Sequence, residues 1–200
     1  MRKLIVLTLF MNIYIFSNYH DTSIVKLKDI DPTILQDVRY ATKNNFTGKV
    51  LYKHKDVYLR YEVACSLKKV NDYLKKNYGY RLLVYDGYRP LSVQKIIWDA
   101  YPNTNYVASP KKGSRHNRGA SVDLTLVDKD GKPLEMGTDY DDFTKKAYAY
   151  YKDLPKNVLA NRKLLQDAMT KFGFRVMTSE WWHFDFVNWE KFNLIDYIPD

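Results

Sequence analysis

The spacing of apolar residues predicts four helices, over residues 59–77, 91–100, 140–151 and 157–172. In the first, apolar residues recur every three or four positions, as on the buried face of an amphipathic helix, and Gly79 follows as a helix stop. Pro90 precedes the second helix and Gly173 follows the fourth, at the positions these residues favour around helix ends. We expect strands and loops in the segments between these helices.

Short apolar runs predict strands over residues 81–86, 120–127, 174–178 and 181–187. Residues 120–127 alternate regularly, so Ser121, Asp123 and Thr125 should share one face while their neighbours enter the core. Helices combined with antiparallel strands predict an α+β fold. We expect a single domain with a central, mostly antiparallel sheet flanked by helices, and a functional site on the sheet.

Two segments carry the residue types that hydrolytic metal sites use: His116 with Asp123, and Glu180 with His183. Catalytic Zn²⁺ usually has three His or Asp/Glu ligands and an open position for a water whose pKa falls to about 7. His116, Asp123 and His183 would supply such ligands. Glu180 would then be free to take the proton of that water and pass it to a leaving amine.

Either segment alone is also compatible with a structural histidine hydrogen-bonded to a nearby acid, because neither spacing is specific. The joint pattern is more specific, since two of the four histidines of the chain fall within these acidic segments. On a regular strand Glu180 and His183 would face opposite sides of the sheet. Glu180 must therefore lie at a bulge or in a turn before the strand, and Thr178 and Ser179 favour the turn.

The motifs Ser114-x-His116-x-x-Gly119-x-x-x-Asp123 and Glu180-Trp181-Trp182-His183 resemble those of the zinc D-alanyl-D-alanine dipeptidases of the vancomycin-resistance type, a branch of the zinc D,D-peptidases. Segments 37–48, 86–90 and 136–141 agree with this family, and the matches run in family order from about residue 28 to residue 187. One departure is Ser121, where the family usually has alanine. Both residues are small, so the resemblance is little affected.

The resemblance implies a role for each matching residue. His116, Asp123 and His183 would bind one Zn²⁺ per subunit, and Glu180 would be the general base and acid. Pro90 disfavours a helical conformation for Arg89, which helps to hold its backbone extended.

Three further residues acquire roles by the same resemblance. Arg89 would stabilise the charge that develops on the scissile carbonyl. Ser114 and Asp141 would lie near the amino terminus of the substrate, although the adjacent Asp142 leaves the register of that acid open by one residue. Trp181 and Trp182 either wall the site or pack in the core.

Composition supports a folded domain and argues against nucleic acid as a partner. The 200 residues are 46% hydrophobic and 28% charged, with a net charge of +9. The lysines are scattered in pairs, and no aromatic-basic binding module is recognisable, so solvated surfaces explain the basic surplus. The single cysteine excludes an internal disulfide. Composition and motifs leave the oligomeric state open.

Residues 1–20 do not belong to the expected catalytic domain, which spans residues 24–200. A basic start and an apolar run of signal-peptide length predict an export signal and hence a periplasmic or cell-envelope protein. No clean cleavage site follows, so an uncleaved anchor is an alternative, as are a buried terminal element and a cytoplasmic location. Stable membrane insertion is expected only if this segment is retained.

Three functions are compatible with these patterns. The first is zinc-dependent hydrolysis of D-alanyl-D-alanine to free D-alanine. The second is a related zinc D,D-carboxypeptidase or peptidoglycan endopeptidase, which would need a more open cleft. The third is a peptidoglycan-binding module without turnover, which Glu180 and Arg89 disfavour because a binder needs neither a base nor a group for an oxyanion.

Overall fold

The computed structural model describes residue 20, residues 22–104 and residues 106–197. The predicted signal or anchor over residues 1–20 therefore lies outside the described residues, except for His20. No helix in the described part of the chain combines the length and hydrophobicity that a membrane crossing requires.

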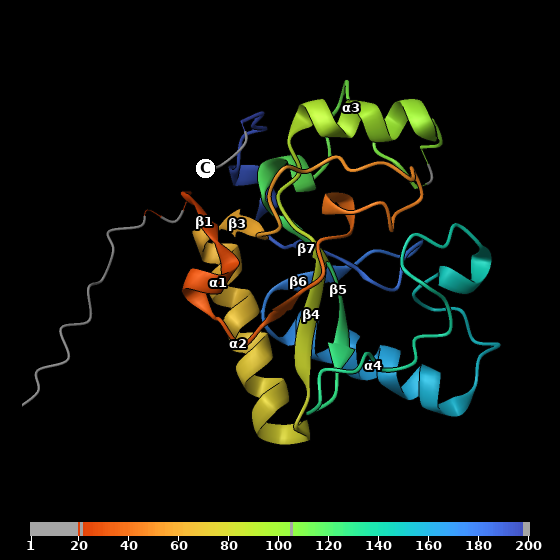
Figure 1. Ribbon diagram of the computed structural model, residues 1–200. Coiled ribbons are helices and arrows are strands. Elements are labelled where there is room, and N and C mark those ends of the chain that lie inside the picture. The colour runs from red at the N-terminus through yellow and green to blue at the C-terminus, as the bar shows by residue number, and fades with distance from the viewer. Residues whose placement is uncertain (1–19, 21, 105, 198–200) are drawn as a thin grey trace, which may run out of the picture.

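A five-stranded mixed sheet forms the centre of the fold (Figure 1). In spatial order its strands are β2 (Leu35–Gln36), β4 (Arg81–Asp86), β5 (Ser121–Val127), β7 (His183–Phe186) and β6 (Phe174–Val176). Strand β2 pairs with β4 in parallel and the other neighbours are antiparallel. Strands β1 (Ile24–Lys26) and β3 (Tyr58–Arg60) form a separate antiparallel pair.

Two long helices pack against one face of this sheet, and a third lies beyond the carboxyl end of one strand. Within the described residues, the α-helices are α1 (Leu27–Ile30), α2 (Tyr61–Tyr78), α3 (Leu91–Ala100) and α4 (Lys156–Lys171). Helices α2 and α4 contact each other and the sheet, whereas α3 lies beyond the carboxyl end of β4 (Figure 1). Helix α2 ends because Gly79 adopts a left-handed conformation with φ 72°. The first, second and fourth predicted helices are therefore confirmed within two residues.

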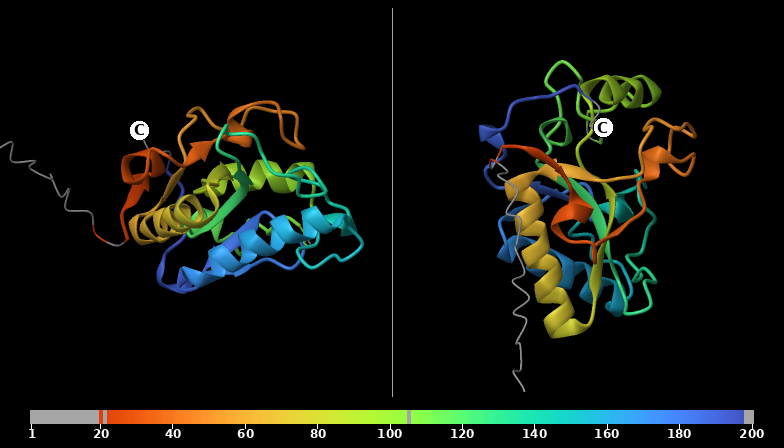
Figure 2. Two further views of the ribbon diagram at one scale, coloured as in Figure 1. Left: turned by 90° about the horizontal axis from the view of Figure 1, so that it is seen from below. Right: turned by 60° about the vertical axis from the view of Figure 1, so that its left-hand side comes forward.

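The two faces of the sheet differ in character. Val122 and Leu124 of β5 are fully buried in the hydrophobic core, while Asp123 and Thr125 alternate with them and face the other way. The left view of Figure 2 shows α4 beneath the sheet and the orange segment before β3 on the opposite side. This architecture confirms the predicted α+β single domain, and the polar face of β5 is covered by loops.

The predicted helix over residues 140–151 is wrong. The segment is a loop with one 3-10 turn, Lys145–Ala147, and Asp141 has φ 62°, which an α-helix cannot continue. Side chains of α4 satisfy the backbone carbonyls of this loop: Arg162 donates to the carbonyls of Lys146 and Tyr148, and Gln166 donates to that of Ala149. Tertiary hydrogen bonds thus replace the helical ones.

Candidate active site

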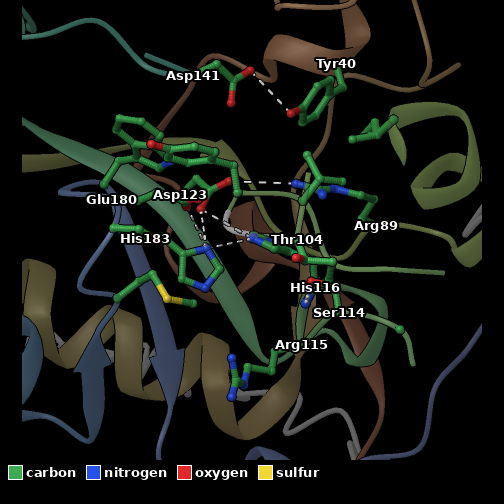
Figure 3. Close-up of a pocket in the computed structure, with 18 of the residues that line it drawn as sticks. Tyr40, Arg89, Thr104, Ser114, Arg115, His116, Asp123, Asp141, Glu180 and His183 are labelled. Carbon is green, nitrogen blue, oxygen red and sulfur yellow. Dashed lines mark hydrogen bonds and ion pairs between the residues drawn. The ribbon is translucent and has the colours of Figure 1, made fainter. Parts of the chain in front are cut away.

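Three ligand-type atoms converge on one point at the sheet. The Nε2 atom of His116 lies 3.2 Å from Nδ1 of His183 and 3.3 Å from Oδ1 of Asp123, and the latter two atoms are 2.9 Å apart (Figure 3). Ligands about 2.0 Å from a tetrahedral Zn²⁺ are themselves about 3.3 Å apart. The three atoms are thus spaced nearly as a tetrahedral metal site requires.

The outer nitrogen of each histidine is fixed by a hydrogen bond to an acceptor. Nδ1 of His116 donates to the carbonyl of Gly87 at 2.7 Å, and Nε2 of His183 donates to Oδ1 of Asp185 at 2.9 Å. Such contacts orient metal-binding imidazoles and leave the inner nitrogens free to bind a cation. The buried donor set of two imidazoles and one carboxylate fits Zn²⁺.

A proton competes with a metal ion at this position. Burial lowers the pKa of His183, but Asp185 and Asp123 raise it more strongly, so the net pKa is well above its usual range. Burial raises the pKa of Asp123, but His116 and His183 hold it far below its usual range. Metal binding must displace the proton of His183, so affinity for the metal should rise with pH.

Strand pairing and a tight turn assemble this cluster. Asp123 and His183 are directly paired residues of antiparallel β5 and β7, so their side chains extend from the same face. His116 begins a 3-10 turn, His116–Arg118, which ends at Gly119 with φ 68°. This φ favours glycine, and a Cβ atom there would lie 2.7 Å from Cδ1 of Ile24 and 3.2 Å from the backbone nitrogen of Arg60.

Glu180 reaches the same cluster from a turn. It precedes β7 and follows the turn at Thr178 and Ser179, which confirms the predicted turn position and removes the need for a bulge. One carboxylate oxygen lies 3.7 Å from Nδ1 of His183, and Glu180 is 9% exposed. Burial raises the pKa of Glu180 to about 7, against a lowering by His183. A carboxylate with this pKa can accept and return a proton near neutral pH.

The raised pKa of Glu180 predicts a pH-dependent stability effect in the metal-free protein. The folded state favours the protonated carboxyl, so the cost of the buried charge is absent below pH 4.5 and complete above about pH 7. Glu180→Gln should therefore stabilise the metal-free protein by about 3 kcal/mol at pH 8 and by less than about 1 kcal/mol at pH 5. Urea unfolding with a chelator at both pH values measures this gain. An equal gain at both would contradict it.

Arg89 lies on another side of the cluster. Arg89 is 7% exposed, and its Nη2 atom lies 3.9 Å from Oδ2 of Asp123. Asp86, fully buried, accepts hydrogen bonds from Arg89 Nε and Nη2 and from the hydroxyl of Tyr52. Burial lowers the pKa of Arg89, but Asp86 raises it more strongly, so the guanidinium keeps its charge.

The predicted substrate-binding residues also line this pocket. Asp141 accepts a hydrogen bond of 3.3 Å from the hydroxyl of Tyr40. In Figure 3 both residues lie above the metal-type cluster, which is formed by His116, Asp123 and His183. Burial and Asp123 raise the pKa of Asp141 well above its usual range. The neighbouring Asp142 lines a different depression and accepts a hydrogen bond from the backbone of Thr144. The geometry thus favours Asp141 over Asp142.

All seven predicted site residues line one pocket of about 450 Å³. They are Arg89, Ser114, His116, Asp123, Asp141, Glu180 and His183. Trp182 lines the same pocket, whereas Trp181 faces the adjacent depression and donates to the hydroxyl of Thr138. The pair of tryptophans therefore divides between the two regions.

Several residues of the site were not singled out from the sequence. They are Tyr40, Tyr52, Asp86, Gln94, Tyr140 and Asp185. Tyr40, Asp86 and Tyr140 fall within the segments that carried the family resemblance. Asp185 is two residues beyond His183 on the same strand, which is a usable signal. Gln94 offers none, because only the tertiary fold brings it here.

The site combines a buried His/Asp/His cluster with the Glu180 carboxylate, 3.7 Å from Nδ1 of His183, and with Arg89 beside Asp123. This combination, on the sheet of an α+β domain, defines a metal-dependent hydrolase. Sequence comparison narrows this class to the metallopeptidases. The chain belongs to the D-Ala-D-Ala dipeptidase family of M15 peptidases, whose family model matches residues 20–194.

Two sequence relatives agree with this assignment. The D-alanyl-D-alanine dipeptidase of Escherichia coli (strain K12) is 37% identical over 164 residues, covering 82% of this chain and 84% of that protein. The dipeptidase of the same name from Enterococcus faecium is 33% identical over 182 residues, covering 79% and 88%. A solved vancomycin-resistance D,D-pentapeptidase in complex with Zn(II) has a TM-score of 0.46 and 17% identity, covering 70% of this chain and 78% of that chain.

Proposed function

We propose that the protein is a zinc-dependent dipeptidase that hydrolyses D-alanyl-D-alanine to free D-alanine. The observation that carries this proposal is the triangle of His116, Asp123 and His183 ligand atoms with the unbound carboxylate of Glu180 beside it. The family membership and the two dipeptidase relatives support the choice of substrate.

His116, Asp123 and His183 would hold one Zn²⁺, because their inner atoms form a buried donor set of suitable spacing. When bound, the ion supplies Lewis acidity, which polarises a peptide carbonyl and lowers the pKa of a water. Asp185 orients His183 through the 2.9 Å hydrogen bond, and Gly87 orients His116 in the same way. The ligands are thereby fixed before substrate enters.

Glu180 and Arg89 act on the reacting atoms. Glu180 accepts a proton from the attacking water and delivers it to the amide nitrogen of the departing D-alanine, a task suited to its pKa of about 7. Arg89 keeps its charge in a water-poor site and donates hydrogen bonds to the oxygen of the scissile carbonyl as negative charge develops there. The two residues divide proton transfer from charge stabilisation.

Asp141 binds the free ammonium group of the dipeptide. The pKa of the half-buried Asp141 carboxyl group is well above its usual range, and an ammonium partner would stabilise its charged form. Tyr40 holds Asp141 by its hydroxyl, and Ser114 lines the same pocket. Recognition of a free amino terminus favours dipeptides over long chains.

We also propose that the protein is exported, on the basis of the basic and apolar residues 1–20.

The proposed activity predicts a simple assay. Purified protein supplied with zinc should release D-alanine from D-alanyl-D-alanine, lose this activity with a chelator, and regain it with added zinc, because the ligand set cannot act without its ion. A pentapeptide ending in D-alanyl-D-alanine is the control substrate and should be cleaved far more slowly. Preferred cleavage of the pentapeptide would indicate a carboxypeptidase, and no turnover with one bound zinc would indicate a binding module.

A further inference from the structure

The guanidinium of Arg89 forms hydrogen bonds with two different side chains, and it lies 5.1 Å from the ring centre of Tyr40. Its Nε and Nη2 atoms donate to Oδ2 of Asp86 at 2.9 and 2.6 Å, and Nη1 donates to Oε1 of Gln94 at 2.9 Å. Both acceptor residues are 0% exposed. A guanidinium has five N–H donors, so two remain free, one on each terminal nitrogen. Nη2 faces Asp123 of the metal-type cluster at 3.9 Å, across the pocket (Figure 3).

The hydrogen bonds with Asp86 alone do not fix the direction in which the free N–H groups of Arg89 point. Both of its hydrogen bonds end on the same oxygen atom, so they form a pivot about which the guanidinium can swing. The bond from Nη1 to Gln94 lies on the other side of the guanidinium and removes this freedom. Orientation of Arg89 therefore depends on Gln94 as well as on its charged partner.

The amide of Gln94 is itself oriented without ambiguity. Its Nε2 atom donates to the carbonyl of Ala108 at 2.8 Å, and a carbonyl can only accept. The amide oxygen must therefore face Arg89. Ala108 belongs to the wall of the pocket, so Gln94 in α3 links the arginine to that wall. Glutamine accepts on one side, donates on the other, and adds no second negative charge beside Arg89.

We propose that Gln94 is a positioning residue for the reaction: it directs the free N–H groups of Arg89 toward the oxygen on which negative charge develops. This inference rests on the proposed role of Arg89. The side chain of Gln94 does not line the pocket. It acts through the guanidinium alone.

The test is a double-mutant cycle on the zinc-loaded enzyme with D-alanyl-D-alanine. Gln94→Met keeps the approximate volume but removes the acceptor, so kcat should fall about 10- to 100-fold while KM changes less than about 3-fold. In an Arg89→Lys background the same substitution should change kcat by less than about 2-fold, because the forked group that Gln94 orients is gone. A loss confined to kcat and dependent on Arg89 is not expected of a packing residue.

Gln36→Met is the matched control. Oε1 of Gln36 also accepts a hydrogen bond, from the backbone N–H of Val57 at 2.7 Å, but Gln36 lies on β2 and does not line the pocket, so kcat should stay unchanged. Gln94→Asn, which retains the amide but is too short to span both partners, should repeat the loss if the methionine variant folds poorly.

Two results would overturn the inference while leaving the proposed function intact. The first is that Gln94→Met and Gln94→Asn both keep the kcat of the parent enzyme, although Arg89→Lys lowers it. The other is an equal fractional loss from Gln94→Met in both backgrounds, which would indicate a purely structural role. Full activity of Arg89→Lys itself would instead remove the role proposed for Arg89, and the positioning role with it.

Discussion

Replacing Glu180 with glutamine should lower kcat for D-alanyl-D-alanine by about 10³-fold or more. General acid-base catalysis contributes about 10²- to 10⁴-fold, and we propose that this residue serves both proton-transfer steps. Glutamine preserves the size and polarity of the side chain but can neither accept the proton of the water nor return it to the amine. The measurement is the initial rate of D-alanine release at saturating substrate, with the zinc content determined on the same sample.

Zinc content decides how this result is interpreted. The carboxylate of Glu180 is 3.7 Å from the nearest ligand nitrogen and is outside the ligand triangle, so Glu180→Gln should still bind one zinc. Asp141→Asn is a matched control, because it replaces a second carboxyl group of the same pocket and should raise KM more than it lowers kcat. If the kcat losses were reversed between the two variants, Asp141 would be the base.

The charges around the pocket explain why it suits a cation in a protein with a net charge of +9. Five buried or nearly buried carboxyl groups gather here: Asp86, Asp123, Asp141, Glu180 and Asp185. The cationic side chains that line the pocket are one fewer: Arg89, Lys112, Arg115 and Arg118. Like charges at this density raise one another's pKa unless a cation intervenes. A divalent ion and the ammonium group of a substrate both relieve this repulsion, so the site is poised for the two ligands the proposal requires.

The central elements and the metal-type cluster could be predicted from local sequence signals. Alternation over residues 120–127 predicts Asp123 on the polar face of its strand. The odd spacing of Glu180 and His183 requires a turn or a bulge, and the structure contains the turn. Both inferences depend only on the period of a strand. Such signals are available wherever the chain is regular and its hydrogen bonds are local.

The support of the site is less predictable because it depends on contacts between distant segments. Residues 140–151 have enough apolar residues for a helix, yet their carbonyls bond to Arg162 and Gln166, and Asp141 adopts a left-handed conformation. Tyr140 lies in this loop and donates to Oδ2 of Asp123 at 3.0 Å. Nothing in its local sequence indicates that partner, since the contact follows from the path of the loop over the sheet.

Arg89→Lys should lower kcat by about 10²- to 10³-fold, comparable to the loss of one oxyanion donor in other hydrolases. Lysine keeps the positive charge and can still pair with the buried Asp86, so the variant should fold and bind zinc. It loses the fork of N–H groups that Asp86 and Gln94 hold toward the pocket. A group acting on developing charge contributes more to the transition state than to the ground state. Binding of a tetrahedral phosphinate analogue of the dipeptide should therefore weaken far more than KM rises. Equal weakening of both would show that Arg89 binds the substrate without assisting its hydrolysis.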